Sequence, residues 1–153
     1  MEKLHAIKRH RKRKRHALPF EGSMNYGYDE IMTASQSHLV VMLYREALAA
    51  LKASIVAIER GDIEMRWRAS SKATNIIAHL YLTLDVERGG DLAENLGRIY
   101  TYILRRLPDI NLKNDPKAAQ ESALLLEPLL TSWENLDIKI SHANKDRVSI
   151  DHN

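Results

Sequence analysis

The sequence contains no cysteine, and only one phenylalanine and two tryptophans stand among its 153 residues. The absence of cysteine excludes disulfides, thiolate zinc sites and cysteine nucleophiles, and it fits a reducing compartment. No apolar run reaches the roughly eighteen residues that would indicate a membrane span. The basic N-terminus lacks the apolar segment of a secretory signal peptide. We therefore expect a cytoplasmic protein, with one main domain at this chain length.

The sequence also lacks the motifs that carry chemistry. None of His38, His79 and His142 has a carboxylate three residues before it, as the Glu-x-x-His motif of di-iron bundles requires. Gly89-Gly90 is not followed by the Lys-Ser/Thr that ends a phosphate-binding loop. The sequence therefore predicts no enzyme, no metal site and no cofactor.

The net charge of +3 hides an uneven distribution of charged residues. Residues 1–23 hold eight Lys or Arg and two Glu, a net charge of +6, and the remainder is mildly acidic. Because like charges repel in a compact form, we expect residues 1–23 to be a disordered basic leader, either native or upstream of the true start. Clustered Lys and Arg bind nucleic-acid phosphates whatever the base sequence, which gives an alternative function as a nucleic-acid-binding helical protein. No base-reading motif accompanies the run, so nucleic acid is the less favoured partner.

Apolar residues after the leader recur with the helical period, and turn residues divide them into helices. The first helix is predicted to begin at Thr33 or Ser35, with Thr33 and Gln36 forming a capping box, and to end at Gly61. Asp62 can then cap the second helix. The predicted inward faces are Val40, Leu43, Ala47, Leu51, Ile55 and Ile58 in the first helix, and Ala69, Ala73, Ile76 or Ile77, Leu80 and Leu84 in the second.

Three further signals divide the second half of the chain. Gly89-Gly90 predicts a tight reversal into a third helix capped by Asp91. Pro108 should end that helix, because proline has no N–H and its ring crowds the preceding turn. Asp115-Pro116 predicts the start of a fourth helix, in which Pro128 predicts a kink. The predicted inward faces are Leu92, Leu96, Ile99, Ile103 and Leu107 in the third helix, and Ala119, Ala123, Leu126, Leu130, Trp133, Leu136 and Ile140 in the fourth.

Four such helices predict an all-α fold, an antiparallel up-and-down four-helix bundle over residues 24–141. Residues 142–153 turn polar and are expected to fray as a C-terminal tail. The third helix carries a second apolar stripe beside its first, formed by Ala93, Tyr100 and Leu104. This surplus predicts either wider contact with the core or a groove for an amphipathic helix of another protein.

Three stretches of the sequence, in order, carry a family resemblance. They are Thr33-Ala34-Ser35 through Met42-Leu43-Tyr44, Leu84-Asp85-Val86-Glu87-Arg88-Gly89-Gly90 through Arg105-Arg106-Leu107, and Asn111-Leu112-Lys113-Asn114-Asp115-Pro116 through Trp133. On these stretches, from about residue 24 to 141, the chain resembles the flagellin-specific export chaperones, the FliS family. It departs from the family pattern at Gln36, where proline is usual, at Arg45-Glu46, where Asp-Gly is common, and at Pro108.

The resemblance implies a cytoplasmic export chaperone that holds newly made flagellin, prevents its premature polymerisation and aids its secretion. In that family the disordered C-terminal segment of flagellin becomes helical over apolar grooves, and components of the flagellar export gate are further partners. By this likeness Tyr26, Tyr28 and Ile31 form a movable cover over the groove. The full set of expected partner-binding residues is Tyr26, Tyr28, Ile31, Met42, Leu92, Ala93, Leu96, Tyr100 and Leu104. Which flagellin is the client, the oligomeric state and the faces that form the groove are left open by the sequence.

Overall fold

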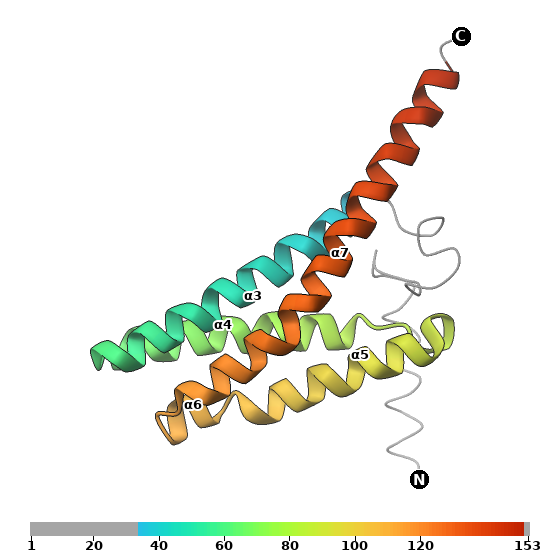
Figure 1. The fold of residues 1–153 in the computed structure, drawn as a ribbon. Helices are drawn as coiled ribbons and strands as arrows, with labels where there is room; N and C mark the ends of the chain where they lie inside the picture. The colour runs from blue at the N-terminus through green and yellow to red at the C-terminus, as the bar shows by residue number, and fades with distance from the viewer. Residues whose placement is uncertain (1–33, 152–153) are drawn as a thin grey trace.

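A computed structural model describes residues 34–151, which form four long helices and one single-turn helix (Figure 1). The helices are α3 (Ala34–Arg60), α4 (Ile63–Leu82), α5 (Val86–Arg106), α6 (Asp109–Leu112) and α7 (Pro116–Ile150). No strand occurs within this part of the chain, and the predicted all-α four-helix bundle is confirmed. The predictions for the basic leader and for Tyr26, Tyr28, Ile31 and Thr33 fall outside the described residues.

Helix α3 is the centre of the bundle. It packs along both α4 and α7, whereas α5 packs mainly on α4 and meets α7 only sparsely. Each apolar side chain removed from water here contributes roughly 1.5–3 kcal/mol, so the core stabilises all four long helices together. The largest fully buried side chains are Val40, Tyr44, Leu51, Ile77, Tyr100, Ile103, Leu107, Ile110, Leu126, Trp133 and Ile140.

Local signals set most of the helix ends where the sequence predicts them. Gly61 ends α3 with a φ of 66°, which glycine adopts without a Cβ penalty. The Asp62 carboxylate accepts a hydrogen bond from the Met65 N–H at 3.0 Å and caps α4. Asp115 caps α7 in the same way, and α5 ends just before Pro108. Ser35, in contrast, lies inside α3 and is not its cap.

The reversal between α4 and α5 lies earlier in the chain than the double glycine. Helix α4 ends at Leu82 and α5 begins at Val86, so the reversal begins before the double glycine. The predicted helix break at Gly89-Gly90 is present, because two helical segments meet at Gly90. Leu84 is buried in the connection, not on the face of the second helix. Gly90 has a φ of 52° and a ψ of −136° inside α5, which breaks the helical geometry there.

The predicted cap of the third helix is corrected with the turn. Asp85 is the N-cap of α5, and its carboxylate accepts a hydrogen bond from the Arg88 N–H at 3.2 Å. Asp91, the predicted cap, lies exposed one residue after the kink. Both aspartates satisfy the local rule for a cap, so local sequence could not choose between them. In the structure Leu84 and Asp85 are both buried next to this helix start, whereas Asp91 is exposed.

The C-terminal tail is also corrected, because α7 does not fray after Ser141. It continues to Ile150, and its last turns extend beyond the other helices (Figure 1). No glycine or proline stands between residues 141 and 150, so nothing local interrupts the helix even though these residues are polar. Pro128 lies inside α7 and does not end it.

Candidate functional site

An apolar groove lies between α5 and α7, two long helices that pack only sparsely on each other. Its volume is about 490 Å³. Ile99 and Tyr102 are one turn apart on α5, and Leu124 and Leu125 lie on the facing side of α7. Leu124 is 68% exposed and Tyr102 is 46% exposed, so apolar surface remains open to water on both walls. Arg98 and Glu121 complete the lining.

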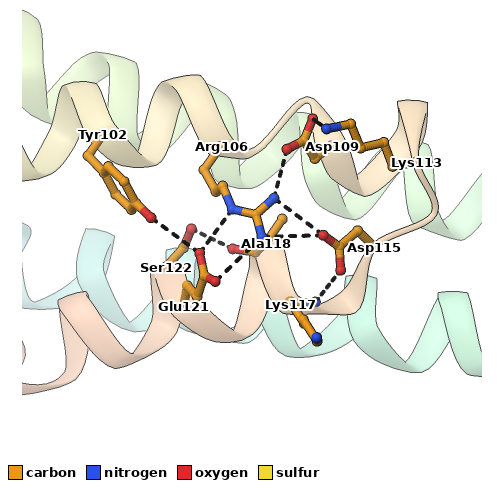
Figure 2. A network of polar contacts seen from close by, with 9 residues as sticks. All are labelled: Tyr102, Arg106, Asp109, Lys113, Asp115, Lys117, Ala118, Glu121 and Ser122. Carbon is orange, nitrogen blue, oxygen red and sulfur yellow. Dashed lines mark hydrogen bonds and ion pairs between the residues drawn. The ribbon is translucent and has the colours of Figure 1, made fainter.

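A polar network centred on Arg106 includes two of the groove residues, Tyr102 and Glu121 (Figure 2). The guanidinium of Arg106 donates to Glu121 Oε2 at 2.9 Å, to Asp109 Oδ2 at 2.7 Å and to Asp115 Oδ2 at 3.3 Å. The Tyr102 hydroxyl also donates to Glu121 Oε2, at 3.3 Å. The network therefore joins α5, α6, the start of α7 and both groove walls.

The charges in this network shift one another's protonation. Hydrogen bonding from Arg106 lowers the pKa of Glu121 below its ordinary value of 4.5, with burial acting in the opposite direction. Hydrogen bonding to Glu121, then to Asp109 and Asp115, raises the pKa of Arg106. Both groups are therefore charged at neutral pH, and the corner is held by charge-assisted hydrogen bonds.

Residues 22–140 match the family described as "Flagellar protein FliS". The chain belongs to the FliS family. The "Flagellar secretion chaperone FliS" of Salmonella typhimurium (strain LT2) is 39% identical over 112 residues, which cover 72% of this chain and 83% of the relative. The protein of that name in Escherichia coli (strain K12) is 35% identical over 105 residues, which cover 68% of this chain and 77% of the relative. The Bacillus subtilis (strain 168) protein is 32% identical over 122 residues, or 80% and 88%.

Membership of the FliS family confirms the resemblance and supports a role as a flagellar export chaperone. The relatives are named as chaperones, not as enzymes. Within residues 34–151 no group of three or more His, Asp or Glu side chains is placed to hold a metal ion. In the same residues no helix is both long and apolar enough to cross a membrane.

The partner-binding residues predicted from the FliS family do not form one open surface. Ala93, Leu96 and Tyr100 are buried in the protein's own core. Leu92 and Leu104 are half-buried and pack against that core. Met42 is exposed on α3. Tyr26, Tyr28 and Ile31 lie outside the described residues. A client role for these residues stays a prediction, and for the three buried ones it would require the bundle to open.

The sequence analysis predicted Ile99 only as an inward-facing residue, and it missed the other five groove residues, Arg98, Tyr102, Glu121, Leu124 and Leu125. A signal for them was present in the run Leu124-Leu125-Leu126, because a helix cannot direct three consecutive side chains to one face. Leu126 is fully buried, so Leu124 must point away from the core. Tyr102 stands three residues after Ile99 and so lies on the same side of α5.

Two smaller hollows lie on the α4 side of α5. One, of about 330 Å³, is lined by residues that include Trp67, Pro108 and Leu112. The other, of about 360 Å³, lies beside the α4–α5 connection and includes Tyr81, Gly97 and other residues of mixed polarity. Trp67 and Leu112 are exposed, so some apolar surface is also open on this side.

Proposed function

We propose that this FliS-family protein is a cytoplasmic export chaperone that binds the disordered C-terminal segment of a flagellin in the groove between α5 and α7. The observation that supports it is the open apolar surface of Leu124 and Tyr102 on opposite walls of one groove. Exposed apolar side chains gathered in a groove mark a site for another protein, and two helices with a furrow between them suit an amphipathic helix.

The energetics suit a client that is disordered until it binds. Such a segment loses conformational entropy when it becomes helical, so apolar burial has to offset that loss. Covering a side chain such as Leu124 contributes roughly 1.5–3 kcal/mol. Anchors spaced by three or four residues on the client helix would follow the spacing of Glu121, Leu124 and Leu125 on α7.

Holding flagellin in this way prevents premature polymerisation and keeps it ready for secretion. The export gate is the partner that would receive the loaded chaperone. Tyr26, Tyr28 and Ile31 remain proposed as a cover over the groove, and Met42 as a contact on α3. No cofactor takes part in this scheme.

The test compares two exposed leucines that differ only in place. Leu124 lies in the groove, whereas Leu112, 78% exposed, lies at the α6 corner. We expect Leu124→Asp to weaken binding of the flagellin C-terminal segment by about tenfold or more, and Leu112→Asp to leave it unchanged. Calorimetric titration measures the affinity, and circular dichroism verifies that both variants fold. Equal affinity of the two variants, or equal binding of flagellin with and without its C-terminal segment, would refute the proposal.

The basic run in residues 1–23 favours a second candidate, nucleic-acid binding through that segment. Eight Lys or Arg can displace counterions from nucleic acid, so the affinity should fall steeply as salt rises. Deleting residues 1–23 should abolish such binding and leave flagellin affinity intact. Nucleic-acid affinity that survives the deletion would eliminate this candidate.

A further inference from the structure

Two arginine side chains link helices at the α6 corner of the bundle, and only one of them bonds a residue that lines the α5/α7 groove. Arg66 of α4 donates to the side-chain oxygens of Asn111 at 3.1 Å and of Asn114 at 2.7 Å. Arg106 of α5 instead bonds three carboxylates, one of which, Glu121, lines the groove. Arg66 bonds two neutral amide oxygens and Arg106 bonds three carboxylates, both beside α6, so a change at Arg66 is a control for the loss of an arginine link at this corner.

The link between Arg106 and Glu121 is directional as well as charged. Arg106 Nε lies 2.9 Å from Glu121 Oε2, and Nη2 lies 3.5 Å from Oε1. A guanidinium that meets a carboxylate through two nitrogens fixes its orientation, which a lysine ammonium cannot do. The Arg106 side chain is 21% exposed and that of Glu121 is 44% exposed, so water and salt partly screen this pair.

The same carboxylate connects the two walls of the groove. Glu121 belongs to α7, and its Oε2 accepts both the Arg106 bond and the hydroxyl of Tyr102 from α5 (Figure 2). Because α5 and α7 pack sparsely, few other contacts set their separation. The orientation of the Tyr102 ring and the position of the α7 wall therefore both depend on Glu121, and Glu121 depends on Arg106.

We propose that Arg106 is a positioning residue for client binding, which acts through Glu121 and Tyr102 to hold the groove at the width that a client helix needs. This inference rests on the proposed function of the groove. Arg106 does not line the groove itself, so its effect on a client is indirect.

The first measurement is affinity for the flagellin C-terminal segment in folded variants. Arg106→Lys keeps the positive charge but loses the two-nitrogen contact with the Glu121 carboxylate, and we expect it to weaken client binding by about tenfold. Arg66→Lys loses a comparable link on the other side of α6, and we expect it to lower the unfolding midpoint in urea without changing the affinity. Glu121→Gln should weaken client binding as Arg106→Lys does, because it removes the charged acceptor that Arg106 and Tyr102 share.

The second measurement is the width of the groove itself, without any client. The chain has no cysteine, so Asn95→Cys on α5 and Glu127→Cys on α7 provide two unique sites for spin labels. Both side chains are exposed. We expect a narrow distribution of distances between the labels in the parent protein, a broader one with Arg106→Lys, and no broadening with Arg66→Lys.

The two measurements separate failure of this inference from failure of the proposed function. If the unmodified protein does not bind the flagellin segment, the proposed function fails, and the spin-label distances still decide whether Arg106 sets the width. If it binds, and Arg106→Lys changes neither the affinity nor the distances, the positioning role is overturned while the groove remains the client site. Equal loss of affinity in Arg66→Lys and Arg106→Lys would also overturn it, because the effect would then be one of general stability.

Discussion

The phenolic oxygen of Tyr44 on α3 is hydrogen-bonded to the phenolic oxygen of Tyr100 on α5 in the interior of the bundle. The ring centroids are 6.4 Å apart, and the Tyr44 ring also lies 6.2 Å from that of Trp133 on α7. Burial raises the pKa of Tyr44 to about 12, although its hydrogen bond to Tyr100 acts in the opposite direction. The three aromatic residues link three helices, which explains why Tyr100, predicted as a client contact, belongs to the core.

A double-mutant cycle tests the link between Tyr44 and Tyr100. Tyr44→Phe should lower the free energy of unfolding by roughly 1–3 kcal/mol, because it takes a partner from a buried hydroxyl. In the Tyr44→Phe variant, the further change Tyr100→Phe should lower the free energy of unfolding by less than it does in the parent protein. The hydrogen bond between the two hydroxyls is already absent from that variant. Urea unfolding at neutral pH measures all four proteins. Strictly additive losses would show that the two hydroxyls do not stabilise the fold together.

The ion pair of Glu121 with Arg106 predicts a pH-dependent stability. The folded-state pKa of Glu121 is lowered from its ordinary value of 4.5, so its contribution is present above 4.5 and is lost as the pH falls through the lowered pKa. The free energies of unfolding of the parent protein and Glu121→Gln should therefore differ at pH 7 and converge in acid. Glu127→Gln, at an exposed site on the same helix, is the control and should show little difference at either pH.

Replacing two glycines of α5 by alanine should change the stability of the protein in opposite directions. Gly90→Ala should destabilise the protein by roughly 1–3 kcal/mol, because the φ of 52° and ψ of −136° suit glycine alone. Space is not the cause, since an added Cβ would meet nothing within 4 Å. Gly97→Ala should stabilise it by up to about 1 kcal/mol, because Gly97 is helical. Its new Cβ would lie 3.6 Å from Leu84 Cδ1, an ordinary contact. Thermal unfolding distinguishes these outcomes, and the same sign for both would contradict the geometry.

The position of the α5 cap can be tested with two aspartates. Asp85→Ala should cost roughly 0.5–2 kcal/mol, because it removes the acceptor for the Arg88 N–H. Asp91→Ala should change the free energy of unfolding by less than about 0.5 kcal/mol, as expected of an exposed surface position. Chemical denaturation of the two variants side by side provides the measurement. A larger loss from Asp91→Ala would restore the double glycine as the true start of the third helix.

The fold itself was largely readable from the sequence, because its signals act over a few residues. Gly61, Pro108 and Asp115-Pro116 each fix the backbone locally, and each marks a junction in the structure. Local signals do not distinguish Asp85 from Asp91 as the cap of the third helix. Both can cap a helix, and the structure has Asp85, which is buried beside Leu84, as the cap of α5. The helical tail beyond Ser141 was missed because polarity is not itself a reason for a helix to end.

The functional surface depended on tertiary structure to a much greater degree. The sequence establishes that α5 has more apolar positions than contact with one neighbouring helix requires, but it does not establish which of them are buried in the bundle. Tyr100 faces the core and Tyr102, two residues later, faces the groove. Tyr100 is held in the core by its contact with Tyr44 of α3, whereas Tyr102 contacts Glu121 of α7, and both contacts join residues far apart in the sequence. Periodicity along one helix determined the surplus of apolar surface, whereas contacts between distant helices decided where it stays open.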